Sequence, residues 1–104
     1  MAEAREVAEG RQIQGVDEQI AYSITTTNWG ASPTTVSVVV KDETDALKDV
    51  TSMVMSTGSP TVAGDVISLP ILKSLTNGHI YRVEVKFTSG GNVYECFFYV
   101  DAQL

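Results

Sequence analysis

The chain has 104 residues, of which 43% are hydrophobic and 19% are charged, a length and balance typical of one folded domain. Seven basic residues stand against 13 acidic ones, and the net charge of -6 leaves too little basic surface for nucleic acid or anionic membranes to be expected partners. The single cysteine excludes an intrachain disulfide, so the fold must rest on its hydrophobic core.

The N-terminal residues 1–15 are polar and rich in charge, and they have two readings. They form either a flexible arm or an edge strand over residues 11–16, in which Ile13 and Val16 gain burial against a sheet. Two glycines weaken the strand reading. Residues 16–104 are predicted to form a single β-sandwich domain.

A first core strand is predicted over residues 20–27, where hydrophobic and polar residues alternate with a period of two. Turn-forming residues follow, and Trp29 among them is expected to plug the core at one end of the sandwich. A β-branched strand then runs over residues 34–42, with Val36, Val38 and Val40 facing inward.

The middle of the chain is predicted as a charged loop over residues 42–49, a short strand over 50–55, a turn, and a further strand over 62–69. Met53 and Met55 share one face of the short strand. The strand over 62–69 is expected to bulge near Gly64.

The clearest pattern lies in the last third, where residues 79–88 alternate without error and residues 93–100 return as the final strand after a Ser-Gly-Gly-Asn turn. Six to seven short strands, turns rich in Gly, Pro, Asn and Ser, and no helical periodicity predict an all-β fold. The expected class is an antiparallel Greek-key β-sandwich of the immunoglobulin or fibronectin III type.

The most specific local signal is the spacing of Leu75, Gly78 and Tyr81, which matches the corner motif of Greek-key sandwiches. In that motif the tyrosine begins the penultimate strand and its hydroxyl bonds to a backbone group upstream. Leu75 is expected to fill the core beside it, and Gly78 to supply a turn conformation that a side chain resists.

Residues 17–24, the corner 75–81 and the ending 81–91 together resemble small phage and prophage proteins described as fibre-tail or tail-associated immunoglobulin-like adaptors. The resemblance covers about residues 16–101 and follows strand pattern more than rare residues, and residues 42–55 depart from it. It implies a structural role in a phage particle, with other phage structural proteins as partners. It carries over no catalytic residue.

The candidate chemistry is sparse, and we expect no enzyme, no cofactor and no metal centre. The only histidine, His79, is expected to be a solvent-facing turn residue, and Cys96 a buried inert thiol. The acidic loop brings Asp42, Glu43, Asp45 and Asp49 near one another. Calcium binding there stays open, although the spacing matches no EF-hand.

The final strand carries the best candidate interface, because Phe97 and Tyr99 occupy its outward face. They form either an exposed apolar patch, which Met53 and Met55 would extend, or the mark of a bulge that slips the register. Contacts there would join the chain to partners or to further copies of itself. The alternative is a carbohydrate-binding or adhesin module, in which Trp29 and Tyr99 stack on sugar rings.

The sequence shows no signal-peptide pattern and no apolar run of membrane-spanning length. This pattern leads us to expect a protein made in the cytoplasm, and the resemblance to phage proteins implies that the host is bacterial and that the protein enters a virion on assembly.

Overall fold

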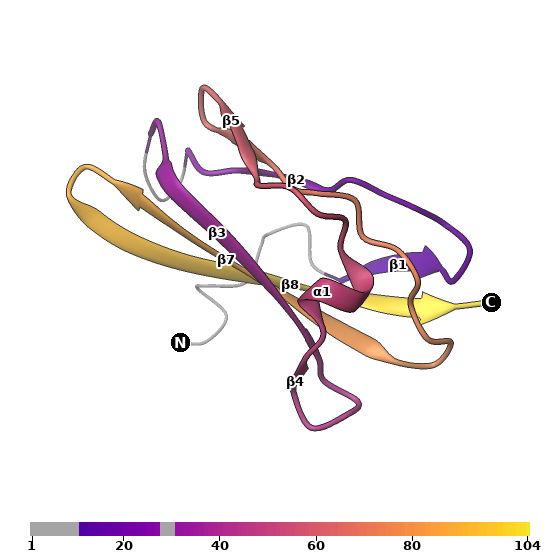
Figure 1. Ribbon diagram of the computed structural model, residues 1–104. Helices are drawn as coiled ribbons and strands as arrows, with labels where there is room; N and C mark the ends of the chain where they lie inside the picture. Colours follow the sequence, from indigo (N-terminus) through magenta and orange to yellow (C-terminus); the bar gives the residue numbers. More distant parts are fainter. Residues whose placement is uncertain (1–10, 28–30) are drawn as a thin grey trace.

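The computed structural model describes residues 11–27 and 31–104, which form two β-sheets around one core (Figure 1). Eight strands and one helical turn follow one another in chain order: β1 (Gln12–Gly15), β2 (Ser23–Thr25), β3 (Thr34–Asp42), β4 (Lys48–Asp49), α1 (Thr51–Val54), β5 (Thr61–Ala63), β6 (Val66–Ser68), β7 (Ile80–Ser89) and β8 (Asn92–Gln103). The all-β prediction is confirmed, with more strands than the six to seven expected. None of the helical structure in the described residues is long and apolar enough to cross a membrane.

The larger sheet has the strand order β1-β8-β7-β3-β4. Its centre is the β7–β8 hairpin, whose turn residues Gly90 and Gly91 both have positive φ angles, 58° and 82°. Such angles suit a two-residue turn and explain why two glycines stand there. The predicted hairpin is thus confirmed. The predicted antiparallel pairing holds for the other strand pairs of the described residues, but β1 pairs with β8 in parallel.

Strand β1 lies within the predicted N-terminal arm and forms an edge of this sheet. Val16 is half-buried, but Ile13 is 64% exposed, and the prediction that Ile13 gains burial is wrong. Ile13 pairs with Asp101 of β8 and shares its outward side. The next residue, Gln14, points inward and is fully buried.

The smaller sheet has the order β2-β6-β5. The predicted single strand over residues 62–69 is wrong, because β5 and β6 are two arms of a hairpin. Gly64 has a φ angle of 60°, and the chain reverses so that Ala63 pairs with Val66. A residue without a side chain therefore marks a turn here and not a bulge.

The predicted strand over residues 50–55 is also wrong, because Thr51–Val54 forms a helical turn. Val50 and Val54, four residues apart, are both buried, which is the spacing of one helical face. Met53 is 63% exposed and Met55 is 6% exposed, so the two methionines do not share a face.

The core lies between the sheets and follows the predicted alternation in the long strands. Tyr81, Val83, Val85 and Phe87 of β7 are buried, and so are Cys96, Phe98 and Val100 of β8. From the smaller sheet, Ile24 and Ile67 meet them. The side chains that alternate with these along β7 and β8 point to the other face of the five-stranded sheet.

Strand β3 is irregular at its start. Its pairing with β7 shifts register between Thr34 and Ser37, so one residue is inserted as a β-bulge. Thr35 sits in this bulge with a φ angle of 53°, a conformation that a β-branched residue rarely adopts.

Candidate functional site

The candidate site is the outer face of the five-stranded sheet, the face turned away from the core. The alternation of side chains along the strands determines which residues lie on it. Along β7 and β8, every second side chain points into the core and the ones between point to this face. The residues paired with the latter on β3, and those at the matching positions in and just before β1, point to the same face. The charged and aromatic side chains on this face are those of Arg11, Lys41, Asp49, Arg82, Glu84, Lys86, Glu95, Phe97, Tyr99 and Asp101.

Two aromatic rings on this face lie beneath arginine side chains. The Arg82 guanidinium carbon is 4.3 Å from the centre of the Phe97 ring, and that of Arg11 is 5.3 Å from the centre of the Tyr99 ring. The two rings meet edge to face with centroids 5.5 Å apart. Both arrangements fall within the range of favourable cation–π and aromatic contacts.

The prediction that Phe97 and Tyr99 form an exposed apolar patch is therefore wrong. Phe97 is only 6% exposed and Tyr99 is half-buried, because guanidinium groups and the neighbouring ring cover them. The slipped register is also wrong, since β7 and β8 pair without a shift over their whole length. What this face offers to a partner is arginine backed by aromatic rings.

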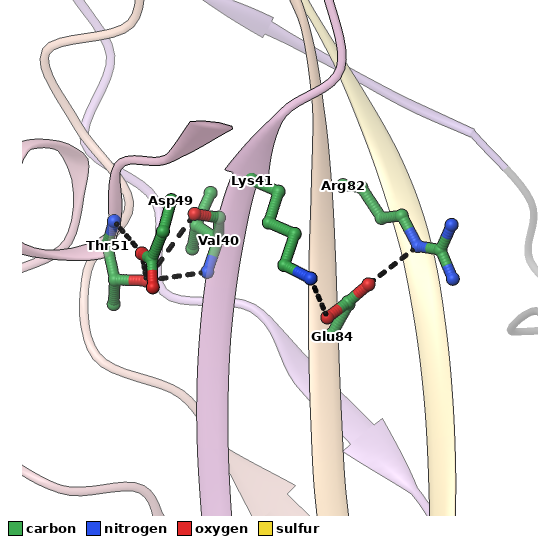
Figure 2. A network of polar contacts seen from close by, with 6 residues as sticks. All are labelled: Val40, Lys41, Asp49, Thr51, Arg82 and Glu84. Atoms are coloured by element: carbon green, nitrogen blue, oxygen red, sulfur yellow. Dashed lines mark hydrogen bonds and ion pairs between the residues drawn. The ribbon is translucent and has the colours of Figure 1, made fainter. Parts of the chain in front are cut away.

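Ion pairs orient the cations on the face (Figure 2). Glu84 lies between two of them: one carboxylate oxygen is 3.5 Å from Lys41 Nζ and the other is 2.9 Å from Arg82 Nε. The latter contact is an ion pair without the alignment of a hydrogen bond. Arg11 Nη1 lies 3.4 Å from an Asp101 carboxylate oxygen. Such pairs add little stability, and their main effect is to fix side-chain positions.

The edge of the sheet at Val40 is closed by a side chain (Figure 2). The Val40 N–H donates to the Thr51 hydroxyl over 2.8 Å, and that hydroxyl donates to an Asp49 carboxylate oxygen over 2.7 Å. The Thr51 N–H donates to the same carboxylate. Donation from the Thr51 hydroxyl and N–H, together with the positive charge of Lys41, lowers the pKa of Asp49 below its ordinary value.

The structure corrects the prediction that His79 is a solvent-facing turn residue without a partner. Its Nδ1 lies 2.7 Å from a carboxylate oxygen of buried Asp42, at the end of β3. The other Asp42 oxygen accepts from the Asp45 N–H. This side of the acidic loop is thus engaged within the chain. The described residues contain no group of three or more His, Cys, Asp or Glu side chains placed to hold a metal ion.

The corner residues lie together. The Tyr81 hydroxyl accepts a 2.8 Å hydrogen bond from the Thr76 N–H, and Leu75 is buried beside it. Gly78 has a φ angle of 83°, and its N–H donates to the Ala102 carbonyl. These contacts tie the start of β7 to the end of β8 and have a structural role.

Sequence reasoning missed a buried polar group, Gln14. Its Nε2 donates to the carbonyls of Glu18 and Leu72 over 2.9 and 2.8 Å, and its Oε1 accepts from the Tyr22 hydroxyl. Burial, and secondarily the charge of Glu18, raises the pKa of that tyrosine. The polar residue between Ile13 and Gly15 gave no sign that it would face the core.

The remaining predicted residues do not join the outer face. Cys96 is buried in the core, and Met53 and Met55 belong to the helical turn and its end. Trp29 lies outside the described residues. The sugar-binding alternative needs Trp29 and Tyr99 side by side, and Arg11 already stacks on the Tyr99 ring.

Comparisons of the chain with models of protein families, with curated proteins and with solved structures found no match.

Proposed function

We propose that the chain is a non-enzymatic structural adaptor of a phage or prophage particle, attached at the tail or the tail fibres and acting through protein–protein contacts. The resemblance over residues 16–101 supports the phage assignment. The outer sheet face supports the mode of action.

We also propose that the sandwich belongs to the immunoglobulin-like Greek-key class. The strand orders β1-β8-β7-β3-β4 and β2-β6-β5 are those expected if β2, β3, β7 and β8 correspond to strands B, C, F and G of that fold. The Tyr81 hydrogen bond at the start of β7 is then the tyrosine corner of strand F.

One observation carries the proposed mode of action, the pairing of Arg82 with Phe97 and of Arg11 with Tyr99 on one face of the sheet. Arginine and aromatic residues are the types enriched in protein interfaces. Rings that hold the guanidinium groups in place reduce the side-chain entropy that a partner must overcome on binding.

Cross-linking within purified particles tests the proposal, because two lysines lie on the face. Lys41 and Lys86 lie on it, whereas Lys73 lies between β6 and β7, outside the face. We expect the chain to be present in particles of the strain that encodes it, with cross-links from Lys41 and Lys86 to another particle protein. Lys73 is the internal control and should give few. A chain absent from intact particles would refute the proposal.

A further inference from the structure

Asn77 and Gly78 are the two central residues of the tight turn that leads into β7. The His79 N–H donates to the Thr76 carbonyl over 3.1 Å and closes this turn. Gly78 has a φ angle of 83°, the value that the third residue of a type II turn requires. Both central residues are exposed, and Asn77 is the only asparagine of the chain that precedes a glycine.

An asparagine before a glycine can react with its own backbone. The nitrogen of the glycine attacks the side-chain carbonyl carbon and forms a new C–N bond. The C–N bond of the side-chain amide breaks, and its nitrogen leaves as ammonia with the proton of the attacking N–H. Water then opens the resulting cyclic imide at either of its two carbonyls, which gives aspartate or isoaspartate without any oxidant or reductant.

Glycine favours the first of these steps, because it has no side chain to hinder the approach to its nitrogen. The space beside Gly78 is open as well. A Cβ atom placed there would meet no atom within 4 Å among the described residues, apart from those next to it in the chain.

Two hydrogen bonds keep the reacting groups of the turn from meeting. The Gly78 N–H donates to the Ala102 carbonyl over 2.9 Å, so its proton is engaged. The Asn77 Oδ1 atom accepts from the Leu104 N–H over 3.1 Å, so the side chain is held toward the end of β8. The attack requires Gly78 to give up its proton and the Asn77 carboxamide to turn toward the Gly78 nitrogen. Both bonds must therefore open first.

We propose that Asn77 is a site of spontaneous deamidation, which contacts between the turn and the end of β8 hold back until the corner opens. This inference goes beyond the adaptor role and does not depend on it. A hollow of about 240 Å³, lined by Asn77, Gly78 and the end of β8, lies open to solvent. Water therefore reaches the imide for the second step.

The reaction changes the corner permanently. Isoaspartate leads the backbone through the former side chain and adds one carbon atom to the turn, so the His79 N–H no longer meets the Thr76 carbonyl as it does now. The Thr76 N–H donates to the Tyr81 hydroxyl, and this bond is disturbed with the turn. A chain that reacts while its corner is open therefore closes less firmly afterwards.

Peptide mass spectrometry measures the reaction directly. Trypsin cuts after Lys73 and Arg82 and releases residues 74–82, in which Asn77 is the only asparagine. In mildly alkaline buffer, the mass gain from replacing NH₂ by OH should accumulate at least about tenfold more slowly in the folded chain than in guanidinium chloride, because opening of the native contacts limits the reaction. Asn92 precedes the β-branched Val93, which hinders the attack, so it is the internal control and should react far more slowly in the unfolded chain.

Two matched pairs of substitutions test the contacts in the folded chain. Leu104→Pro removes the N–H that holds Asn77 Oδ1, whereas Leu104→Ala keeps it, and Leu104 is 93% exposed, so neither change disturbs the core. Leu104→Pro should deamidate at least about twofold faster than Leu104→Ala. Tyr81→Phe loosens the corner and should deamidate about fivefold faster than Tyr94→Phe, which removes a hydroxyl elsewhere. Circular dichroism checks that all four variants are folded.

Faster reaction in either pair, together with slower reaction in the folded than in the unfolded wild type, supports the inference. Equal rates in the folded and unfolded chains, or an Asn77 that stays intact in guanidinium chloride, would overturn it. Equal rates within both pairs would also overturn it, because the named contacts would then not hold the reaction back. None of these results bears on the adaptor role, which the cross-links test separately.

Discussion

The Gln14 carboxamide oxygen accepts a 2.9 Å hydrogen bond from the Tyr22 hydroxyl, across the space between edge strand β1 and the segment that enters β2. The same carboxamide donates to the carbonyls of Glu18 and Leu72. A fully buried side chain thus satisfies polar groups from three separate segments. A buried network of this kind stabilises only when all its members are paired.

Gln14→Leu is therefore expected to destabilise the fold by about 1–3 kcal/mol, because it removes hydrogen bonds to the Glu18 carbonyl and the Tyr22 hydroxyl and leaves the Leu72 carbonyl with the Ile20 N–H as donor. Urea unfolding measures the change. Tyr22→Phe is the matched control: it removes one hydrogen bond only and should cost less. Equal stability of Gln14→Leu and the wild type would show that the network contributes nothing.

The corner hydrogen bond gives a second prediction. Tyr81→Phe should lower the free energy of unfolding by about 1 kcal/mol, because the Thr76 N–H loses its acceptor. Thermal unfolding detects such a loss. Tyr94→Phe removes a hydroxyl that accepts a long, 3.3 Å hydrogen bond from Asn92 on the surface, and should leave the melting temperature nearly unchanged. Equal effects of the two substitutions would count against the corner.

Thr35 in the β3 bulge gives a stabilising prediction. Its φ angle of 53° strains a β-branched residue, and a left-handed conformation of this kind costs about 1–3 kcal/mol. Thr35→Gly removes the strain but adds entropy to the unfolded chain, so we expect a net gain of about 1 kcal/mol. Thr34→Gly, one residue earlier and without a positive φ angle, should be destabilising. Calorimetry of the pair distinguishes them.

The Thr51 hydroxyl gives a fourth prediction. Thr51→Val keeps the shape of the side chain but leaves the Val40 N–H without its acceptor, so we expect a loss of about 1–2 kcal/mol. Amide hydrogen exchange should show faster exchange at Val40, while Val83 in the centre of the sheet stays protected. Unchanged exchange at Val40 would mean that another group replaces the hydroxyl.

Asp65 gives a prediction about pH. Donation from the Ser32 N–H and the Thr27 hydroxyl lowers the pKa of Asp65 in the folded protein. A folded-state pKa below the unfolded one stabilises the fold above about pH 4, and this contribution disappears as the pH falls through the lower, folded-state pKa.

Asp65→Asn should accordingly be less stable than the wild type at pH 7, and the difference should shrink as the pH falls to about 2. Urea midpoints at both values measure it. Asp17→Asn removes a charge at an exposed turn, and it controls for the loss of a charge alone. A difference that is equally large at low pH would contradict the assignment.

The long hairpin and the corner could be predicted from sequence because local rules determine them. Strict alternation in β7 and β8 fits one register only, since a slip by one residue would expose Tyr81 and Phe87. Two glycines of positive φ angle fixed the turn. The segments within residues 50–69 are too short for a clear periodicity. The four apolar residues of the segment 50–55, for example, fit a strand or a helical turn equally well.

The candidate site was less predictable, because its contacts join residues that are distant in sequence. The outward position of Phe97 was predictable, but its cover was not, since Arg82 belongs to another strand and stacks through a long flexible side chain. Arg11 lay in a segment with no clear pattern. The pairing of His79 with Asp42 likewise depends on how β3 meets the corner.

The parallel pairing of β1 with β8 affects how the protein is made. The first strand of the larger sheet has its hydrogen-bonding partner in the last one, so β1 stays unpaired while the intervening strands are synthesised. The smaller sheet needs only β2, β5 and β6, all of which leave the ribosome earlier. Long-range pairing of this kind folds slowly, so the larger sheet is completed only after β8 has emerged from the exit tunnel.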